Sequence, residues 1–136
     1  MGTRSTIALE YADGSVGQIY CHWDGYLEHN GKILFNDYTD PFKVRDLLNN
    51  GDMSTLSKRV DSCGFYKNRS EDCCSEDCSQ RMFKDFDDYR KNGKFEEYNY
   101  ILRRDGQWYV EFYGEFDGEF DGLLAEAFES QKENEE

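Results

Sequence analysis

Two Asp-Gly pairs, each placed between β-prone runs, constrain the fold of this chain more than any other feature. Asp-Gly is a favoured dipeptide of the tight turns that join antiparallel strands. Residues 5–11 and 16–23 flank the first pair, and residues 97–103 and 107–113 flank the second. The sequence therefore predicts two β-hairpins, one near the start of the chain and one closer to its end.

Helical signals lie between and after the predicted hairpins. The clearest begins at Asp40, which fits an N-cap, continues with Pro41 at the first helical position, and stops at Asn50-Gly51. Other helical patterns cover residues 30–39, 54–60, 81–91 and 123–130. Because these signals do not alternate with single strands as β-α-β units, we expect an α+β fold. In this fold an antiparallel sheet built from two hairpins packs against short helices.

The length of 136 residues fits one domain with a C-terminal extension. We expect the α+β domain to span residues 1–114. Residues 115–136 are predicted to form an acidic C-terminal segment with a short helix and a frayed tail. Residues 62–80 have no useful periodicity, so we expect an irregular loop there.

Negative charge is concentrated at the C-terminal end of the chain. The net charge is −13, and residues 105–136 account for −10 of it, with eleven acidic residues against one lysine. Such a chain repels nucleic acid and anionic membrane surfaces. We therefore expect a partner protein with a basic surface, without direct binding to nucleic acid or membrane.

Several features of the sequence favour a cytoplasmic location. No run of residues is apolar for long enough to act as a signal peptide or to span a membrane. The five cysteines are an odd number, which favours reduced thiols over a disulfide framework.

Six short motifs spread over residues 1–113 occur here as a set. They are MGTRS at the start, YCHWDGY at 20–26, HNGKIL at 29–34, GDMSTL at 51–56, Cys63-x-x-Tyr66-x-x-Arg69-x-Glu71, and the late pair EEYNY and DGQWYV. With these motifs the chain resembles a group of small proteins of bacteriophages and prophages. The resemblance implies a virus-borne protein that acts in the cytoplasm of a bacterial host. It brings no enzymatic activity with it.

Cysteines in the predicted irregular loop are candidate zinc ligands. The set comprises Cys63, Cys73, Cys74 and Cys78, with His22 or His29 available as a further ligand. Their spacing lacks the paired CxxC knuckles that are typical of structural zinc sites. Reduced thiols without a metal are the simpler interpretation, so we expect no cofactor and keep zinc as the alternative.

The residue types of a Cys/His catalytic site are present, but their spacing does not favour catalysis. Cys21 and His22 are adjacent in a predicted strand, and neighbouring side chains of a strand point to opposite faces. No phosphate-binding glycine loop and no hydrolase motif occurs in the sequence. We therefore expect a protein that is not an enzyme.

A polar and aromatic set of residues is a candidate ligand pocket. Aromatic rings stack on a nucleotide base, and arginine pairs with phosphate. The set consists of Arg4, His22, Trp23, Asp24, Tyr26, Tyr66 and Arg69. Together in space, these residues would suit a nucleotide-signal-binding, sponge-like anti-defence protein. Ordinary core packing with surface arginines is the simpler interpretation.

Acidic and aromatic residues alternate around the end of the second predicted hairpin. The candidate partner-binding residues are Glu111, Glu115, Phe116, Asp117, Glu119, Phe120 and Asp121. A row of carboxylates approximates the charge density of duplex DNA, and aromatic rings supply contact area. Our leading hypothesis is a DNA-mimic-like inhibitor of a host nucleic-acid-binding or defence protein. The alternative is a solvated acidic tail that aids solubility.

Overall fold

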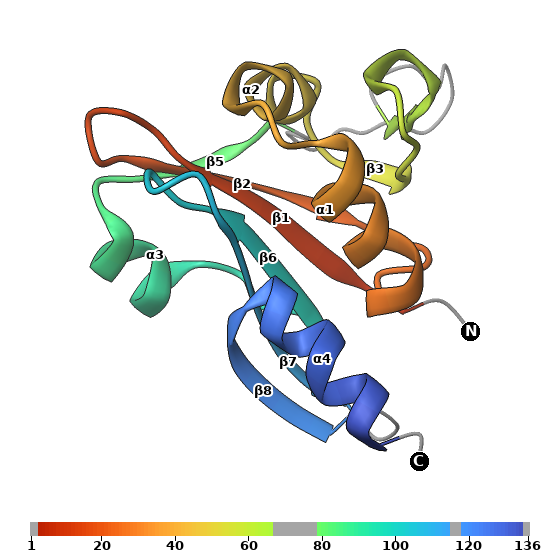
Figure 1. The fold of residues 1–136 in the computed structure, drawn as a ribbon. Coiled ribbons are helices and arrows are strands. Elements are labelled where there is room, and N and C mark those ends of the chain that lie inside the picture. The colour runs from red at the N-terminus through yellow and green to blue at the C-terminus, as the bar shows by residue number, and fades with distance from the viewer. Residues whose placement is uncertain (1–2, 67–78, 115–117, 135–136) are drawn as a thin grey trace.

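The fold is organised around one eight-stranded sheet (Figure 1). The computed structural model describes residues 3–66, 79–114 and 118–134. The strands lie in the order β4-β3-β2-β1-β6-β7-β8, and β5 pairs with β2 beside this path. Their bounds are β1 Ser5–Glu10, β2 Val16–Cys21, β3 Met53–Thr55, β4 Gly64–Phe65, β5 Arg81–Phe83, β6 Tyr98–Leu102, β7 Trp108–Gly114 and β8 Gly118–Leu123.

Both predicted hairpins are confirmed. β1 pairs antiparallel with β2, and β6 pairs antiparallel with β7. Gly14 and Gly106 adopt φ values of 93° and 81° in the connecting turns, a conformation that favours glycine. The Asp-Gly pairs therefore mark the two turns because the glycine of each pair readily adopts the positive φ that the turn requires.

The two hairpins lie side by side through a parallel pairing of β1 with β6, and β2 also pairs in parallel with β3. The predicted α+β class is confirmed, but the sheet is mixed where the sequence indicated a wholly antiparallel one. Turn residues fix pairing within a hairpin. Pairing between hairpins depends on tertiary packing, which leaves no local signal.

Four α-helices accompany the sheet in the part of the chain that the structure describes. They are α1 Lys32–Asp37, α2 Pro41–Asn49, α3 Phe86–Asn92 and α4 Leu124–Asn134. A π-helical turn at Leu27–Gly31 precedes α1. The prediction for α2 is confirmed, because the Asp40 side chain accepts a hydrogen bond from the Phe42 N–H and Pro41 is the first helical residue.

Two of the helical predictions are wrong for part of their length. Residues 53–55 form β3 instead of a helix because they pair with the end of β2, and only Val60–Ser62 form a short 3-10 turn. Residues 81–83 form β5, and α3 starts after Asp85, whose carboxylate caps the Asp88 N–H. The region predicted as an irregular loop contains β4, and its residues 67–78 lie outside the described residues.

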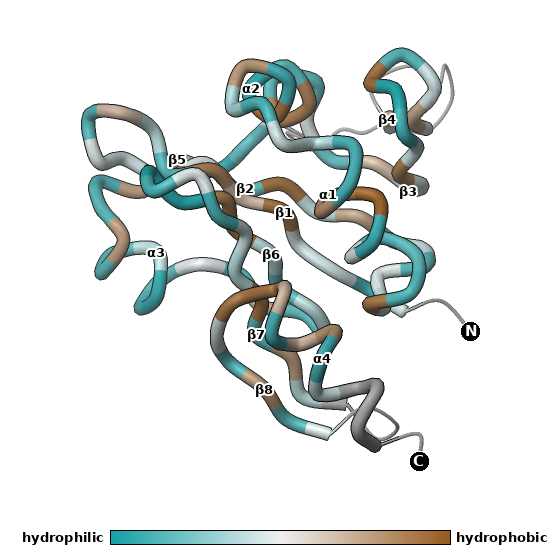
Figure 2. The backbone as a smooth tube through the Cα atoms, viewed as in Figure 1, coloured by the Kyte–Doolittle hydropathy of each residue, from teal (hydrophilic) through white to brown (hydrophobic). Residues whose placement is uncertain are grey.

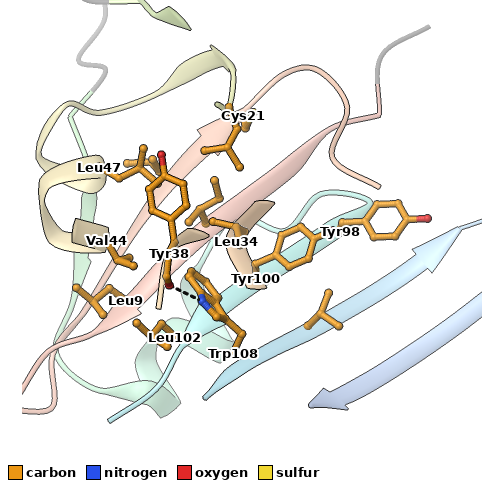
Figure 3. Packing of buried hydrophobic residues seen from close by; sticks show 14 of the residues in the cluster. Leu9, Cys21, Leu34, Tyr38, Val44, Leu47, Tyr98, Tyr100, Leu102 and Trp108 are labelled. Atoms are coloured by element: carbon orange, nitrogen blue, oxygen red, sulfur yellow. Dashed lines mark hydrogen bonds between the residues drawn. The ribbon is translucent and has the colours of Figure 1, made fainter. Parts of the chain in front are cut away.

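One face of the sheet carries the main core, under α1, α2 and α4 (Figure 1). Figure 2 shows the hydrophobic stretches on the central strands, whereas α3 is mostly hydrophilic. In Figure 3 the indole N–H of Trp108 donates to the backbone carbonyl of Tyr38 at 2.9 Å. The Tyr38 hydroxyl donates in turn to the Ser57 carbonyl at 2.7 Å. These two bonds tie β7 and the chain after β3 to the end of α1.

α3 covers only part of the opposite face, which we call the second face. Its Tyr89 packs there with Ala8, Val16 and Ile101 in a smaller apolar cluster. Beyond α3, the chain crosses this face in a segment held by Asn99, whose amide donates to the Glu96 carbonyl at 2.8 Å. The second face therefore stays open toward β7 and β8.

The described residues of the acidic C-terminal segment belong to the same sheet and core as the rest of the fold. β8 pairs with β7 through six residue pairs, from Tyr109 opposite Leu123 to Gly114 opposite Gly118. α4 then returns over the core face, where Leu124 and Ala127 are fully buried. β8 and α4 therefore complete both the sheet and the core.

Candidate partner-binding face

The register of β7 and β8 gathers acidic side chains on the second face. Glu111 lies opposite Asp121, and Tyr113 lies opposite Glu119. Because side chains alternate along a strand, these four residues share one face of the sheet. We call Glu111, Tyr113, Glu119 and Asp121 the acidic face.

The acidic face borders a hollow of about 650 Å³ in the protein surface. Its lining includes Phe95, Glu96 and all four residues of the acidic face. The Tyr113 ring is 77% exposed, and Phe95 is 37% exposed. Carboxylates next to open aromatic rings suit a guanidinium or ammonium group, which gains ion pairing and cation–π contact together.

Arg90 of α3 is the cation that meets the acidic face. Its guanidinium lies 3.2 Å from a Glu111 carboxylate oxygen and 3.3 Å from one of Asp121. Among the described residues, neither Glu119 nor Glu96 takes part in an ion pair. Arg90 therefore holds β7 and β8 carboxylates together while the face remains negative.

A second hollow, of about 560 Å³, lies along α3 and includes Arg90 in its lining. Arg103 contributes to it and places its guanidinium 3.7 Å from the centre of the Phe86 ring. The same guanidinium pairs with the carboxylate of Glu10 at 3.1 Å. Burial alone would raise the pKa of Glu10, but hydrogen bonds from Arg103 and the Arg104 backbone bring it below its ordinary value. Both arginines of this hollow are thus engaged by carboxylates.

The structure brings together Glu111, Glu119 and Asp121 from the predicted partner-binding residues. Phe120 lies on the other face of β8, where its ring packs against the core with its centroid 5.8 Å from that of Phe112. Both phenylalanines also form part of the lining of the first hollow. Glu115, Phe116 and Asp117 lie outside the described residues.

Sequence reasoning missed several residues of this site. Counting every second residue from Glu111 would have found Tyr113, since both lie on one strand face. Glu96, Phe95 and Arg90 come from a separate segment of the chain, and no sequence signal connects them to β8.

Residues of the predicted ligand pocket meet only in part. The His22 and Trp23 rings make an edge-to-face contact, with their centroids 4.7 Å apart. The Tyr20 hydroxyl is hydrogen bonded to His22 Nδ1 at 2.7 Å. Burial raises the pKa of Tyr20, the charge of Arg4 lowers it, and the charges of Glu96 and then Tyr66 raise it further. Tyr20, which the predicted set did not include, thus contacts His22 and responds to the charges of Arg4 and Tyr66.

The remaining members of that set lie elsewhere or outside the description. Asp24 occupies a turn with a φ of 59°, and Tyr26 approaches the ring of His29 at 6.2 Å. Arg69 lies outside the described residues. Of the predicted pocket residues that the structure describes, none lines either of these two hollows or a third beside Lys43 and Arg59.

The two described cysteines are buried, and neither has features of a reactive thiol. Burial raises the pKa of Cys21 to about 11 and also raises that of Cys63. Thiols whose pKa is raised in this way are protonated near neutral pH and are poor nucleophiles. Cys73, Cys74 and Cys78 lie outside the described residues. Within the described ranges no group of three His, Cys, Asp or Glu side chains is placed to hold a metal ion.

Comparisons with protein-family models, with curated proteins and with solved structures find no match. Among the described residues, no helix combines the length and apolar character needed to cross a membrane. The case for a function therefore rests on the geometry and charge of the acidic face.

Proposed function

We propose that this chain is a non-enzymatic binding protein that presents its acidic face to a basic surface on another protein. The observation that carries the proposal is the register of β7 and β8, which aligns three carboxylates and an exposed tyrosine on one face of the sheet. The partner is a nucleic-acid-binding or defence protein of a bacterial host, whose basic groove the face occupies as a DNA mimic. The phage-like motifs supply this setting.

The arrangement has an energetic cost that packing does not explain. Glu111 and Asp121 lie directly opposite each other, and like charges in that relation destabilise a sheet. Arg90 offsets this repulsion, but Glu119 adds a further carboxylate on the outermost strand. A role in binding explains why the clustered carboxylates are kept despite their mutual repulsion. The positive charges of a basic partner attract them, which strengthens binding and speeds association.

Tyr113 supports the same interpretation. It is the most exposed of the large hydrophobic residues that the structure describes, although it shares its sheet face with three carboxylates. Tyrosine is enriched among the residues that dominate binding energy at protein interfaces. A partner that covers the carboxylates would also bury this ring.

The decisive experiment compares two pairs of charge-neutralising substitutions. Glu119→Gln with Asp121→Asn removes two charges from the acidic face. Glu126→Gln with Glu129→Gln removes two exposed charges from α4 and leaves that face unchanged. Each protein is used to capture host proteins from bacterial lysate at 50 and 500 mM salt, followed by mass spectrometry.

We expect a host protein that the wild type and the α4 variant capture at low salt, and that the acidic-face variant loses. High salt should release it, because screening weakens attraction between exposed charges. Equal capture by both variants would refute the proposal. Deleting residues 115–136 is a poorer test, since it removes β8 and the buried Leu124 and Ala127.

A further inference from the structure

β8 forms one edge of the sheet. Among the described residues it pairs only with β7, and Figure 1 shows it as the outermost strand on that side. An edge strand presents backbone N–H and C=O groups that a further strand can pair with. The residues of β8 that direct these groups outward can be identified from the hydrogen bonds of its neighbour β7.

The backbone direction along β7 is fixed by its hydrogen bonds on the β6 side. The N–H of Tyr113 donates to the carbonyl of Glu97 at 3.2 Å, so the backbone polar groups of Tyr113 point toward β6. Backbone direction alternates along an antiparallel strand, so Phe112 points its groups toward β8. Phe112 lies opposite Phe120, and these two residues therefore form a hydrogen-bonded pair.

By the same alternation, Glu119 and Asp121 direct their backbone N–H and C=O groups to the open edge. They are also the two residues of β8 that contribute carboxylates to the acidic face. A strand placed against β8 would thus meet donors, acceptors and negative charges at the same two positions. Side chains directly opposite each other share one sheet face, about 5 Å apart.

From this coincidence we propose that β8 takes up an extended basic segment of the partner protein as an additional strand. The incoming strand carries lysine or arginine at every second position, opposite Glu119 and Asp121. Those basic side chains face the hollow lined by Phe95, Glu96 and Tyr113. This inference rests on the proposed function, since it specifies how the acidic face is used.

The charges of β8 also select against other occupants of the edge. A second copy of this chain, paired through β8, would bring Glu119 and Asp121 close to their own counterparts, and like charges across strands are unfavourable. Charged residues on an edge strand are a common protection against such self-association. The charges of β8 therefore disfavour pairing with a second copy of this chain and favour pairing with a positively charged strand.

Two synthetic peptides of identical composition test the strand pairing. One alternates valine and lysine over seven residues, and the other groups its three lysines at one end. Isothermal titration at low salt measures the binding of each to the full-length wild type. We expect the alternating peptide to bind at least tenfold more tightly, since only its extended form places every lysine on the acidic face. Equal affinities would overturn strand pairing.

Backbone methylation of the alternating peptide adds a test that requires no protein variant. Methyl groups on every second backbone nitrogen block one hydrogen-bonding edge of an extended strand, and shifting them by one residue blocks the other edge. Two edges are available to the peptide, and it pairs with β8 through one of them. We expect one methylated series to lose binding and the other to retain it, whereas equal behaviour of the two series would overturn the inference.

Asp121→Pro and Asp121→Asn form a charge-matched pair of protein variants. Both remove the carboxylate, but only proline removes the outward N–H, and proline is tolerated on edge strands. We expect weaker peptide binding to the proline variant, with circular dichroism confirming that both variants are folded. If the peptide tests fail while Glu119→Gln with Asp121→Asn still loses the captured host protein, the proposed function stands and strand pairing does not.

Discussion

Glu111 and Asp121 lie directly opposite each other on β7 and β8, and both carboxylates contact the guanidinium of Arg90. This three-residue contact fixes α3 to the sheet edge and sets the charge of the acidic face. Because Arg90 is 39% exposed, solvent screens both ion pairs, and each contributes little to stability.

Arg90→Gln should lower the free energy of unfolding by about 0.5 kcal/mol at low salt, because Glu111 and Asp121 then repel each other with no cation between them. Adding Asp121→Asn should restore most of the loss, since one of the two charges is removed. Urea unfolding of the single and double variants measures both effects. A single variant as stable as the wild type at low salt would show that the contact is energetically neutral.

Trp108→Phe should lower the free energy of unfolding by about 1–3 kcal/mol. The substitution leaves the buried carbonyl of Tyr38 without the indole donor and reduces the packed volume. Tyr38→Phe is the matched control, because it removes the bond to the Ser57 carbonyl and the weaker contact with the Cys63 thiol, keeps the packed ring, and should cost less. Chemical denaturation followed by circular dichroism gives the ranking, which a larger loss in Tyr38→Phe would reverse.

The pH dependence of stability should contain a contribution from Glu10. Its pKa is lowered in the folded protein, so the stabilisation is present above the ordinary value of 4.5 and disappears as the pH falls through the lowered pKa. Glu10→Gln should be less stable than the wild type by about 1–2 kcal/mol at pH 6. The difference should shrink steadily below pH 4.5. A gap that stays constant down to pH 3 would assign the effect to packing instead of ionisation.

Cys21 and Cys63 should resist thiol reagents in the folded protein. Both are buried, and with a pKa of about 11 the Cys21 thiol is only about one part in a thousand ionised at pH 8. Iodoacetamide labelling with peptide mapping should modify these two cysteines only after guanidinium is added. Labelling of Cys21 in the native protein as fast as in the unfolded chain would contradict its placement.

Nucleotides should leave the thermal stability of the protein unchanged. The rings of His22 and Trp23 touch each other, but no hollow described here is lined by them. A bound ligand at 100 times its dissociation constant would add about 2.7 kcal/mol of stability, which thermal unfolding detects readily. A shift with any member of a nucleotide panel, lost in Trp23→Ala, would favour the nucleotide-binding hypothesis over the acidic face.

Local chemistry made part of this fold predictable. The Asp-Gly turns gave both hairpins, and the Asp40 cap with Pro41 gave the start of α2. In each case one or two neighbouring residues determine the conformation, so a single sequence carries the information. β3 was missed because its strand character comes from pairing with β2, a partner more than thirty residues away.

The residues of the candidate site were likewise predictable only where the local sequence determines them. Glu119 and Asp121 were identifiable from composition. Alternation would have placed Phe120 on the opposite face, but no strand was predicted there, because β8 is defined by its pairing with β7. Arg90 and Phe95 reach the site from α3 and the segment after it, through tertiary packing alone. The charge of the surface was thus predictable, and its counter-ion and its hollow were not.

The parallel pairing of β1 with β6 joins residues that are far apart in the chain, as in the contact between Thr6 and Asn99, 93 positions along. Contacts of such long sequence separation slow folding, because a large loop must close before they form. On the ribosome, the first hairpin is complete long before its neighbour has been synthesised, and one flank of β1 waits without a partner. That flank is covered only after residues 98–102 have been synthesised and β6 can pair with β1.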